Sequence, residues 1–202
     1  MGFRLSELAR GRYSCPMPWS KKKPGTGIVH TEASLYDYAI AALGRRMRSV
    51  AEIKRLMRLR LAGQPDADVL MEAVVERLKE QRYLNDATYA GAFASLRKEN
   101  NRFGRQRVAS ELKQRGVHAD VIEKAVASTY AGVNDEQLAR SFLMRKRLNK
   151  PATQKDAARI FRALARAGFA SQIIFRILKK WEVEDEVLVA LESEVDPETQ
   201  SS

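Results

Sequence analysis

RVASELKQRGV, residues 107–117, returns 52 residues later as RIFRALARAGF, residues 159–169. The arginine, leucine and glycine positions coincide, and so do the apolar residues that follow the arginine and the glycine. The agreement continues beyond the glycine, where Val121-Ile122 matches Ile173-Ile174. Self-similarity at a fixed period is typical of repeat architectures, in which each copy is one small folding unit.

A third copy lies upstream of these two. Ile53 aligns with Val108 at a shift of 55 residues, and Asp68-Val69-Leu70 then aligns with Asp120-Val121-Ile122 at a shift of 52. The difference of three residues falls in the intervening loop around Pro65. The chain therefore contains three tandem copies.

Each copy is predicted to form three helices, because its apolar residues recur at helical spacing instead of alternating as in a strand. The expected helices are 34–48, 50–61 and 68–81, then 87–99, 105–115 and 119–129, and finally 135–148, 155–167 and 171–181. Capping-box spacing supports three of the helix starts: Ser34 with Asp37, Ser49 with Glu52, and Thr153 with Asp156. Gly116 and Gly168 stand where a left-handed residue would end a helix.

The predicted fold is all-α, an elongated helical repeat of three tandem three-helix units. A unit of about 50 residues has little core of its own, so neighbouring units are expected to stack and share apolar surface. We expect a flexible basic arm at 1–30, units at 31–84, 85–132 and 133–181, and an acidic tail at 182–202.

Composition removes several classes of protein. The single cysteine, Cys15, excludes an internal disulfide and a cysteine-based zinc site. No apolar stretch approaches the ~18 residues of a membrane span, and no apolar signal-peptide core is present. The two histidines, His30 and His118, form no metalloprotease or triad motif, and no P-loop occurs. We therefore expect a cytoplasmic, non-enzymatic protein without a cofactor or a metal.

Charge is distributed unevenly along the chain. The net charge is +11, but all 36 lysines and arginines precede residue 182, whereas eight of the 25 acids follow residue 181. The first 181 residues therefore carry a net charge of +19. The acidic tail is either a solvated terminus or an internal mimic that competes with an anionic ligand for the basic body. Four apolar residues in it, at 187–189 and 191, could form part of a short packed helix.

The basic residues cluster at corresponding places of the three copies, so stacked units would display them as a stripe. Such a stripe suits a phosphate backbone or an acidic protein groove, although a merely solvated surface is the alternative. Tyr83, Tyr89, Phe93 and Phe103 could stack on bases or, as we expect, pack between helices. The candidate contact residues are Arg45, Arg46, Lys54, Arg58, Arg105, Arg107, Lys113, Arg115, Arg159 and Arg162.

Several segments together resemble the RecX family of regulators of the RecA recombinase. The resemblance is carried by AALGRR at 41–46, by LKEQRYLND at 78–86, and most strongly by FGRQRV at 103–108 with ELKQRGV at 111–117. It covers about residues 34–181. The first 30 residues, the long acidic tail and Leu61, which stands where the other copies have glycine, depart from the pattern.

The resemblance implies three tandem three-helix units that bind a filament of RecA on single-stranded DNA. It also implies modulation, usually inhibition, of ATP hydrolysis and strand exchange, with no catalysis by this chain. We expect a monomer that contacts RecA and single-stranded DNA, with no membrane partner. Two alternatives stay open from the residues alone: a transcription regulator built on helix-turn-helix-like units, and an adaptor that binds an acidic protein without DNA.

Overall fold

The computed structural model describes residues 29–183, and all the regular secondary structure in this part of the chain is helical. The expected arm lies outside it except for residues 29 and 30, and the tail lies outside it after residue 183. The elements are α1 (Glu32–Arg45), α2 (Val50–Arg60), α3 (Ala67–Glu80), α4 (Asp86–Leu96), the π-helical turn η1 (Arg97–Asn101), α5 (Arg105–Gln114), α6 (Ala119–Thr129), α7 (Asp135–Arg145), α8 (Gln154–Arg166) and α9 (Ser171–Lys179).

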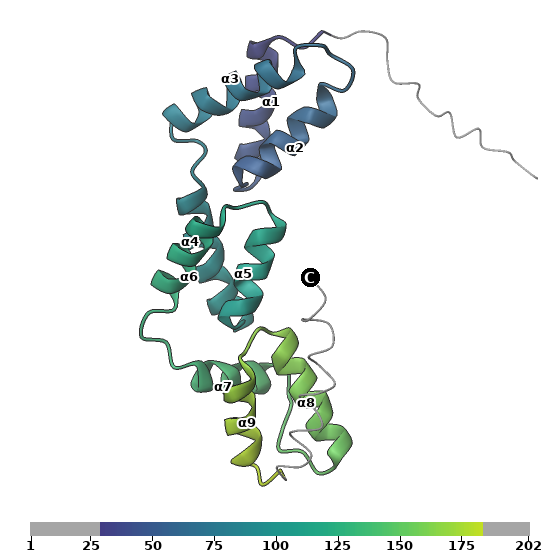
Figure 1. Ribbon diagram of the computed structural model, residues 1–202, viewed down its shortest axis with the longest axis vertical. Coiled ribbons are helices and arrows are strands. Elements are labelled where there is room, and N and C mark those ends of the chain that lie inside the picture. Colours follow the sequence, from purple (N-terminus) through teal and green to yellow (C-terminus); the bar gives the residue numbers. More distant parts are fainter. Residues whose placement is uncertain (1–28, 184–202) are drawn as a thin grey trace, which may run out of the picture.

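The helices contact one another mainly within three successive groups of three: α1–α3, α4–α6 and α7–α9. Figure 1 shows these groups, here called units 1, 2 and 3, following one another along the long axis of the molecule. The all-α, elongated architecture predicted from the repeat is thus confirmed, and the three groups are consistent with three tandem units.

Side-chain caps begin several of the helices. Ser49 and Thr153 each complete a capping box, with Glu52 and Asp156 respectively. The third expected box is wrong, because Thr31 caps α1 and Ser34 is the third residue of that helix. Two overlapping pairs have the same spacing here, so the sequence pattern alone does not distinguish them.

The first helices of all three units end earlier than expected. In unit 2 the predicted helix 87–99 is divided, since α4 ends at Leu96 and the π-helical turn η1 follows it. Arg102 then ends the turn in the left-handed region, with φ of 58°. Lys98 Nζ in this turn donates to Thr129 O at 2.9 Å, a contact with the end of α6 that helical periodicity cannot anticipate.

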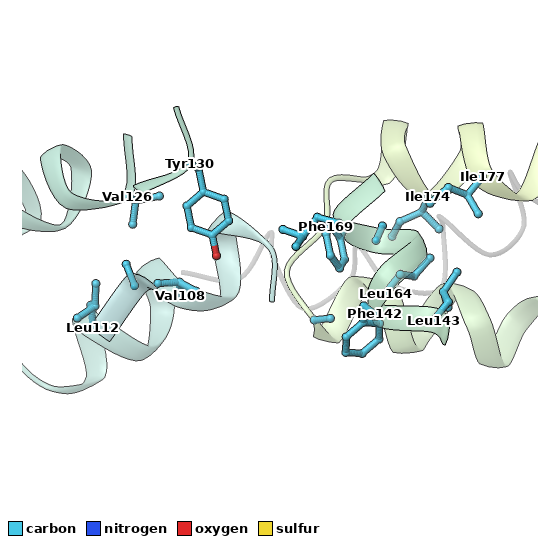
Figure 2. Packing of buried hydrophobic residues seen from close by; sticks show 14 of the residues in the cluster. Val108, Leu112, Val126, Tyr130, Phe142, Leu143, Leu164, Phe169, Ile174 and Ile177 are labelled. Atoms are coloured by element: carbon cyan, nitrogen blue, oxygen red, sulfur yellow. The ribbon is translucent and has the colours of Figure 1, made fainter. Parts of the chain in front are cut away.

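The buried apolar residues form two separate clusters. Eleven belong to unit 1, among them Ile53, Met57 and Leu78. The second cluster has 21 residues and runs without a break through units 2 and 3. Figure 2 shows the two halves of this larger cluster, with Tyr130 and Phe169 labelled at their facing edges. Units 2 and 3 therefore share a core, and unit 1 has its own.

Candidate functional site

The second helices of the three units meet end to end. At the first junction, the Ser49 hydroxyl that caps α2 donates to the Arg115 carbonyl at the end of α5, at 2.6 Å. Ser49 is completely buried there. A Cβ placed on Gly116 would lie 2.5 Å from the Cβ of Ala51, so the glycine after α5 sits directly against the first turn of α2.

The second junction repeats this arrangement with different chemistry. The backbone N–H of Gly104, the N-cap of α5, donates to the Ala167 carbonyl at the end of α8, at 2.8 Å. Gly168 has φ of +85°, and a Cβ on it would lie 2.2 Å from the Arg107 nitrogen. Glycine is needed here both for the left-handed backbone and for the close approach.

The two junctions align α8, α5 and α2 as one column in which each C-terminal end rests on the N-terminal end of the next helix. Figure 1 shows these three helices along the same side of the molecule. The partly negative end of one helix then faces the partly positive end of another, which is the favourable pairing of helix dipoles. Side chains on the outer faces of these helices are therefore displayed in series.

Two predicted contact residues, Arg115 and Arg105, connect neighbouring units, and a third, Arg46, pairs within unit 1 with the carboxylate that Arg115 binds. Arg115 Nη1 lies 2.9 Å from Glu52 Oε1, across the first junction, and its guanidinium lies 4.8 Å from the Phe93 ring centroid. Arg46 lies 3.8 Å from the same carboxylate oxygen. Arg105 Nη2 donates to the Tyr130 carbonyl at 3.2 Å.

Arg105 also spans the boundary between units 2 and 3. Its Nε lies 3.4 Å from an oxygen of Asp135 in α7. Tyr130, beside Arg105, is fully buried, and its hydroxyl donates to the Phe103 carbonyl at 2.7 Å. Burial raises the pKa of Tyr130 to about 12. Arg105 and Tyr130 thus connect the end of α6 to the start of α5 and of α7.

Arg107 and Arg159, by contrast, line a groove where α5, α7 and α8 meet. The groove has a volume of about 450 Å³. Lys146 at the end of α7 and Arg166 at the end of α8 complete a set of four cations, all exposed. Phe103, Phe142 and Leu148 form its apolar wall. We call this feature the junction groove.

The cations of the junction groove differ in their local partners. Arg107 Nε donates to Glu111 at 2.9 Å, so its charge is partly compensated. Arg166 Nε donates to the Arg162 carbonyl at 3.2 Å and keeps its full positive charge. Arg159 makes no ion pair or hydrogen bond within the described part of the chain, and no carboxylate lines the groove. The groove is therefore suited to bind an anion.

The remaining predicted residues are spread over the three helices of the column and, for Arg45, the end of α1. Lys54 pairs with Glu72 at 2.5 Å. Arg45, Arg58 and Lys113 are exposed and form no ion pair within residues 29–183. Arg162 is exposed on α8 between Arg159 and Arg166. The structure thus does not bring the ten residues together at one site.

Lys146 and Arg166 are not among the ten contact residues predicted from the sequence. The signal for Arg166 is its spacing, since Arg159, Arg162 and Arg166 recur on one face of α8. No sequence signal identified Lys146, which reaches the groove only because the end of α7 packs beside α8. Of the aromatic residues, Tyr89 is buried and Phe93 and Phe103 are partly buried, whereas Tyr83 is 58% exposed.

Among residues 29–183, no group of three or more His, Cys, Asp or Glu side chains is arranged to hold a metal ion. No helix in the same region is both long and apolar enough to cross a membrane.

Comparison with known proteins gives the family. A regulatory protein RecX from Chromobacterium violaceum is 32% identical over 145 residues, which are 72% of this chain and 89% of that protein. The chain belongs to the RecX family. The family model described as the second three-helix domain of RecX matches residues 85–126, from the N-cap of α4 into α6.

Other RecX proteins extend the comparison. The regulatory protein RecX of Mycolicibacterium vanbaalenii is 32% identical over 143 residues, covering 67% of this chain and 76% of that protein. That of Bacillus velezensis is 29% identical over 152 residues, and the match spans 75% of this chain but only 56% of the longer relative.

Crystal structures of RecX proteins share the fold. The structure from Lactobacillus salivarius superimposes with a TM-score of 0.61 at 18% identity, over 75% of this chain and 96% of that one. A second RecX structure gives a TM-score of 0.60 over 74% and 71% of the two chains. These likenesses concern the fold of the RecX proteins and carry no residue roles.

Proposed function

We propose that this chain is a non-catalytic regulator that binds the RecA–single-stranded DNA filament and inhibits its ATP hydrolysis and strand exchange. Through this activity it would act in homologous recombination, DNA repair and the SOS response. The observation that carries the proposal is the column of α8, α5 and α2, with the cationic junction groove beside it. Family membership supports it through the relatives' name, regulatory protein.

Multivalency explains how such a column would bind its ligand. An extended column of cations matches an extended anionic ligand, and each phosphate that is neutralised releases counterions. Individually weak contacts held at fixed spacing by the two junctions act together, so the combined affinity exceeds that of any one contact. A monomer is sufficient for this mode of binding.

The proposed contact residues are those whose charge faces outward. They are the junction-groove cations Arg107, Lys146, Arg159 and Arg166 together with Arg45, Arg58, Lys113 and Arg162. Lys54 is included, with its charge partly compensated by Glu72. Arg105 and Arg115 act through the geometry of the junctions, which keeps the column aligned. Arg46 supports the first junction from within unit 1, through the Glu52 carboxylate that Arg115 also binds.

The test is DNA-dependent ATP hydrolysis by RecA on single-stranded DNA, with this protein titrated from substoichiometric amounts to saturation. We expect hydrolysis to fall as the protein is added. Arg159→Glu should raise the concentration needed for half inhibition by about tenfold, because it loses one charge contact and adds a repulsive one. Lys124→Glu is the matched control, since it makes the same charge change on an exposed site of α6 outside the column and the groove.

Hydrolysis that stays unchanged up to saturation would contradict the proposal. A binding measurement with a dT oligonucleotide at the same salt concentration then identifies the alternative. Oligonucleotide binding without a filament effect favours a DNA-binding module. The absence of both oligonucleotide binding and an effect on the filament favours an adaptor for an acidic protein. Equal inhibition by the Arg159 and Lys124 variants would remove the junction groove from the contact surface.

A further inference from the structure

The junction groove is one end of a longer trough. It shares Leu148 and Arg159 with a second hollow of about 230 Å³ formed by the loop between α7 and α8. That hollow shares Pro151 and Ala152 with a third, of about 310 Å³, at the start of α8. The three hollows therefore follow α8 from its C-terminal end to its N-terminal cap. We call the whole feature the α8 trough.

Cations dominate the α8 trough, and its floor is apolar. Of the two acids that line it, Asp156 is engaged in the capping box with Thr153. The other is Glu182, at the end of the described chain. Trp181 and Val183 contribute to the apolar floor at that end. The cations along the trough are Arg107, Lys146, Arg147, Lys150, Arg159 and Arg166.

The chain leaves the described structure inside this trough. Val183, the last described residue, lines the third hollow, and its N–H donates to the Leu178 carbonyl at 3.2 Å. Glu182, the residue before Val183, accepts a hydrogen bond from Lys150 Nζ, with 2.6 Å between Nζ and Oε2. This hydrogen bond lowers the pKa of Glu182. The first acid of the acidic run is thus already paired with a cation of the trough.

The sequence that follows is complementary to the trough. Residues 184–202 contain seven acids and no lysine or arginine, and Val187, Leu188, Val189 and Leu191 lie among the acids. From Ala157 to Arg166 the trough follows nine residues of helix, roughly 14 Å. Nineteen residues can extend to about 60 Å, so the segment is long enough to reach the junction groove.

We propose that residues 184–198 dock into the α8 trough, with their carboxylates on its cations and their aliphatic residues on its apolar floor. The segment would then occupy the junction groove and compete with any other anionic ligand. Because it is tethered at Val183, its effective concentration is in the millimolar range, on the order of that given by a short linker. This consequence for regulation rests on the proposed function, whereas the docking itself does not.

An acidic peptide fits the trough better than a nucleic acid does. The hollow that Val183 lines contains Pro151, Ala157 and Trp181 and no lysine or arginine among its described lining residues, whereas the cations line the other two hollows. A segment with mixed acidic and aliphatic residues matches both parts, and burial of its aliphatic side chains adds about 0.8 kcal/mol for each CH₂ group.

The experiment uses the full-length chain with Trp19→Phe, so that Trp181 is the only tryptophan. One variant neutralises the segment by Glu184→Gln, Asp185→Asn and Glu186→Gln, and a second removes its apolar contacts by Leu188→Ser and Leu191→Ser. The matched control neutralises three exposed acids outside the trough: Asp37→Asn, Glu80→Gln and Glu123→Gln. Acrylamide quenching of Trp181 reports docking, and affinity for a dT oligonucleotide at low salt reports competition.

We call the Trp19→Phe chain the parent. At low salt, we expect acrylamide to quench Trp181 about twofold more strongly in either segment variant than in the parent. The parent should show the same increase at about 1 M salt, where ion pairs are screened. The neutralised variant should bind the oligonucleotide about threefold more tightly than the equally charged control. Quenching that is equal in parent, control and both segment variants would overturn the docking, and protection of Trp181 by the oligonucleotide would then assign the trough to nucleic acid.

The two proposals fail separately in this design. Stronger quenching in the segment variants, combined with no effect of any form on RecA, supports the docking and contradicts the proposed function. Stronger quenching with the same oligonucleotide affinity in segment variant and control supports the docking and overturns the competition.

Discussion

At the scale of single residues, the contact between Gly104 and Gly168 determines how closely units 2 and 3 can approach. A Cβ on Gly104 would lie 2.1 Å from the Gly168 carbonyl oxygen and 2.9 Å from the Phe169 nitrogen. These are backbone atoms, which cannot move aside as the end of a flexible side chain can. The close packing that connects the two halves of the larger core therefore depends on a residue with no side chain.

We expect Gly104→Ala to lower the free energy of unfolding by about 1–3 kcal/mol, the range for overpacking a well-packed site. Gly91→Ala is the control, because Gly91 lies within α4 and a Cβ there would meet nothing within 4 Å. Alanine should stabilise that helix by up to about 1 kcal/mol. Urea unfolding of the two variants measures the difference, and equal stabilities would contradict the importance of the glycine contact.

Tyr130 predicts a pH dependence. Its pKa is raised to about 12 in the folded chain by burial, whereas an unfolded tyrosine titrates near 10. Between these values the unfolded state has lost the proton and the folded state has kept it, so stability falls as pH rises. Two pKa units correspond to a loss of about 2–3 kcal/mol by pH 12.

The measurement is urea unfolding of the wild type and Tyr130→Phe at pH values from 9 to 12. Phenylalanine removes the titrating group along with the hydrogen bond to Phe103, so the variant should begin less stable and lose less stability with pH. Both proteins contain the same lysines, which titrate in the same pH range. Comparing the slopes of unfolding free energy against pH therefore removes the effect of these lysines. Parallel slopes would show that Tyr130 does not cause the dependence.

At the scale of helices, the same sequence pattern serves two purposes. Ser49 and Thr153 both cap a helix through a capping box. Ser49 is also buried at a junction, where its hydroxyl donates to the Arg115 carbonyl. Thr153 is exposed, because α8 has no following unit against its N-terminal end among the described residues.

Ser49→Ala should therefore destabilise the protein more than Thr153→Ala. Loss of an exposed cap costs about 0.5–1 kcal/mol. At Ser49 the part-buried hydrogen bond to the Arg115 carbonyl would be lost as well, which brings the expected total to about 2–3 kcal/mol. Thermal unfolding of both variants tests this, and equal effects would mean that the first junction adds nothing to the cap.

At the scale of the whole molecule, the two cores indicate two levels of stability. Unit 1 buries eleven apolar residues in a core of its own, whereas units 2 and 3 share 21. The first junction connects the two cores through polar contacts, chiefly those of Ser49, Glu52 and Arg115. Polar contacts of this kind contribute less than a continuous apolar core does.

Hydrogen exchange in increasing denaturant should resolve this difference. Amides of Ile53 and Val74 are expected to exchange through an opening of unit 1 alone, with a free energy on the order of 2 kcal/mol below that for Leu112 and Leu164. The amides of Leu112 and Leu164, in units 2 and 3, should exchange with the same free energy of opening. A single common opening for all four amides would show that the molecule unfolds as one cooperative body.

Much of the architecture could be predicted from the repeat. The match between 107–117 and 159–169 located α5 and α8 and the glycines that follow them, because helical periodicity and left-handed glycines are local features. The family followed from ordered motifs along the chain and is confirmed by the relatives. The predicted cap at Ser34 was wrong, because two overlapping capping patterns compete there.

That the chain is helical, repeated and strongly basic can be predicted without the structure, since these properties depend on residues close together in the chain. The role of each cation, by contrast, depends on how the helices pack. Arg105 and Arg107 are two residues apart, yet one connects α5 to Asp135 and Tyr130 while the other lines the junction groove. Which face of a helix meets another unit depends on packing between distant segments, and local sequence does not encode it.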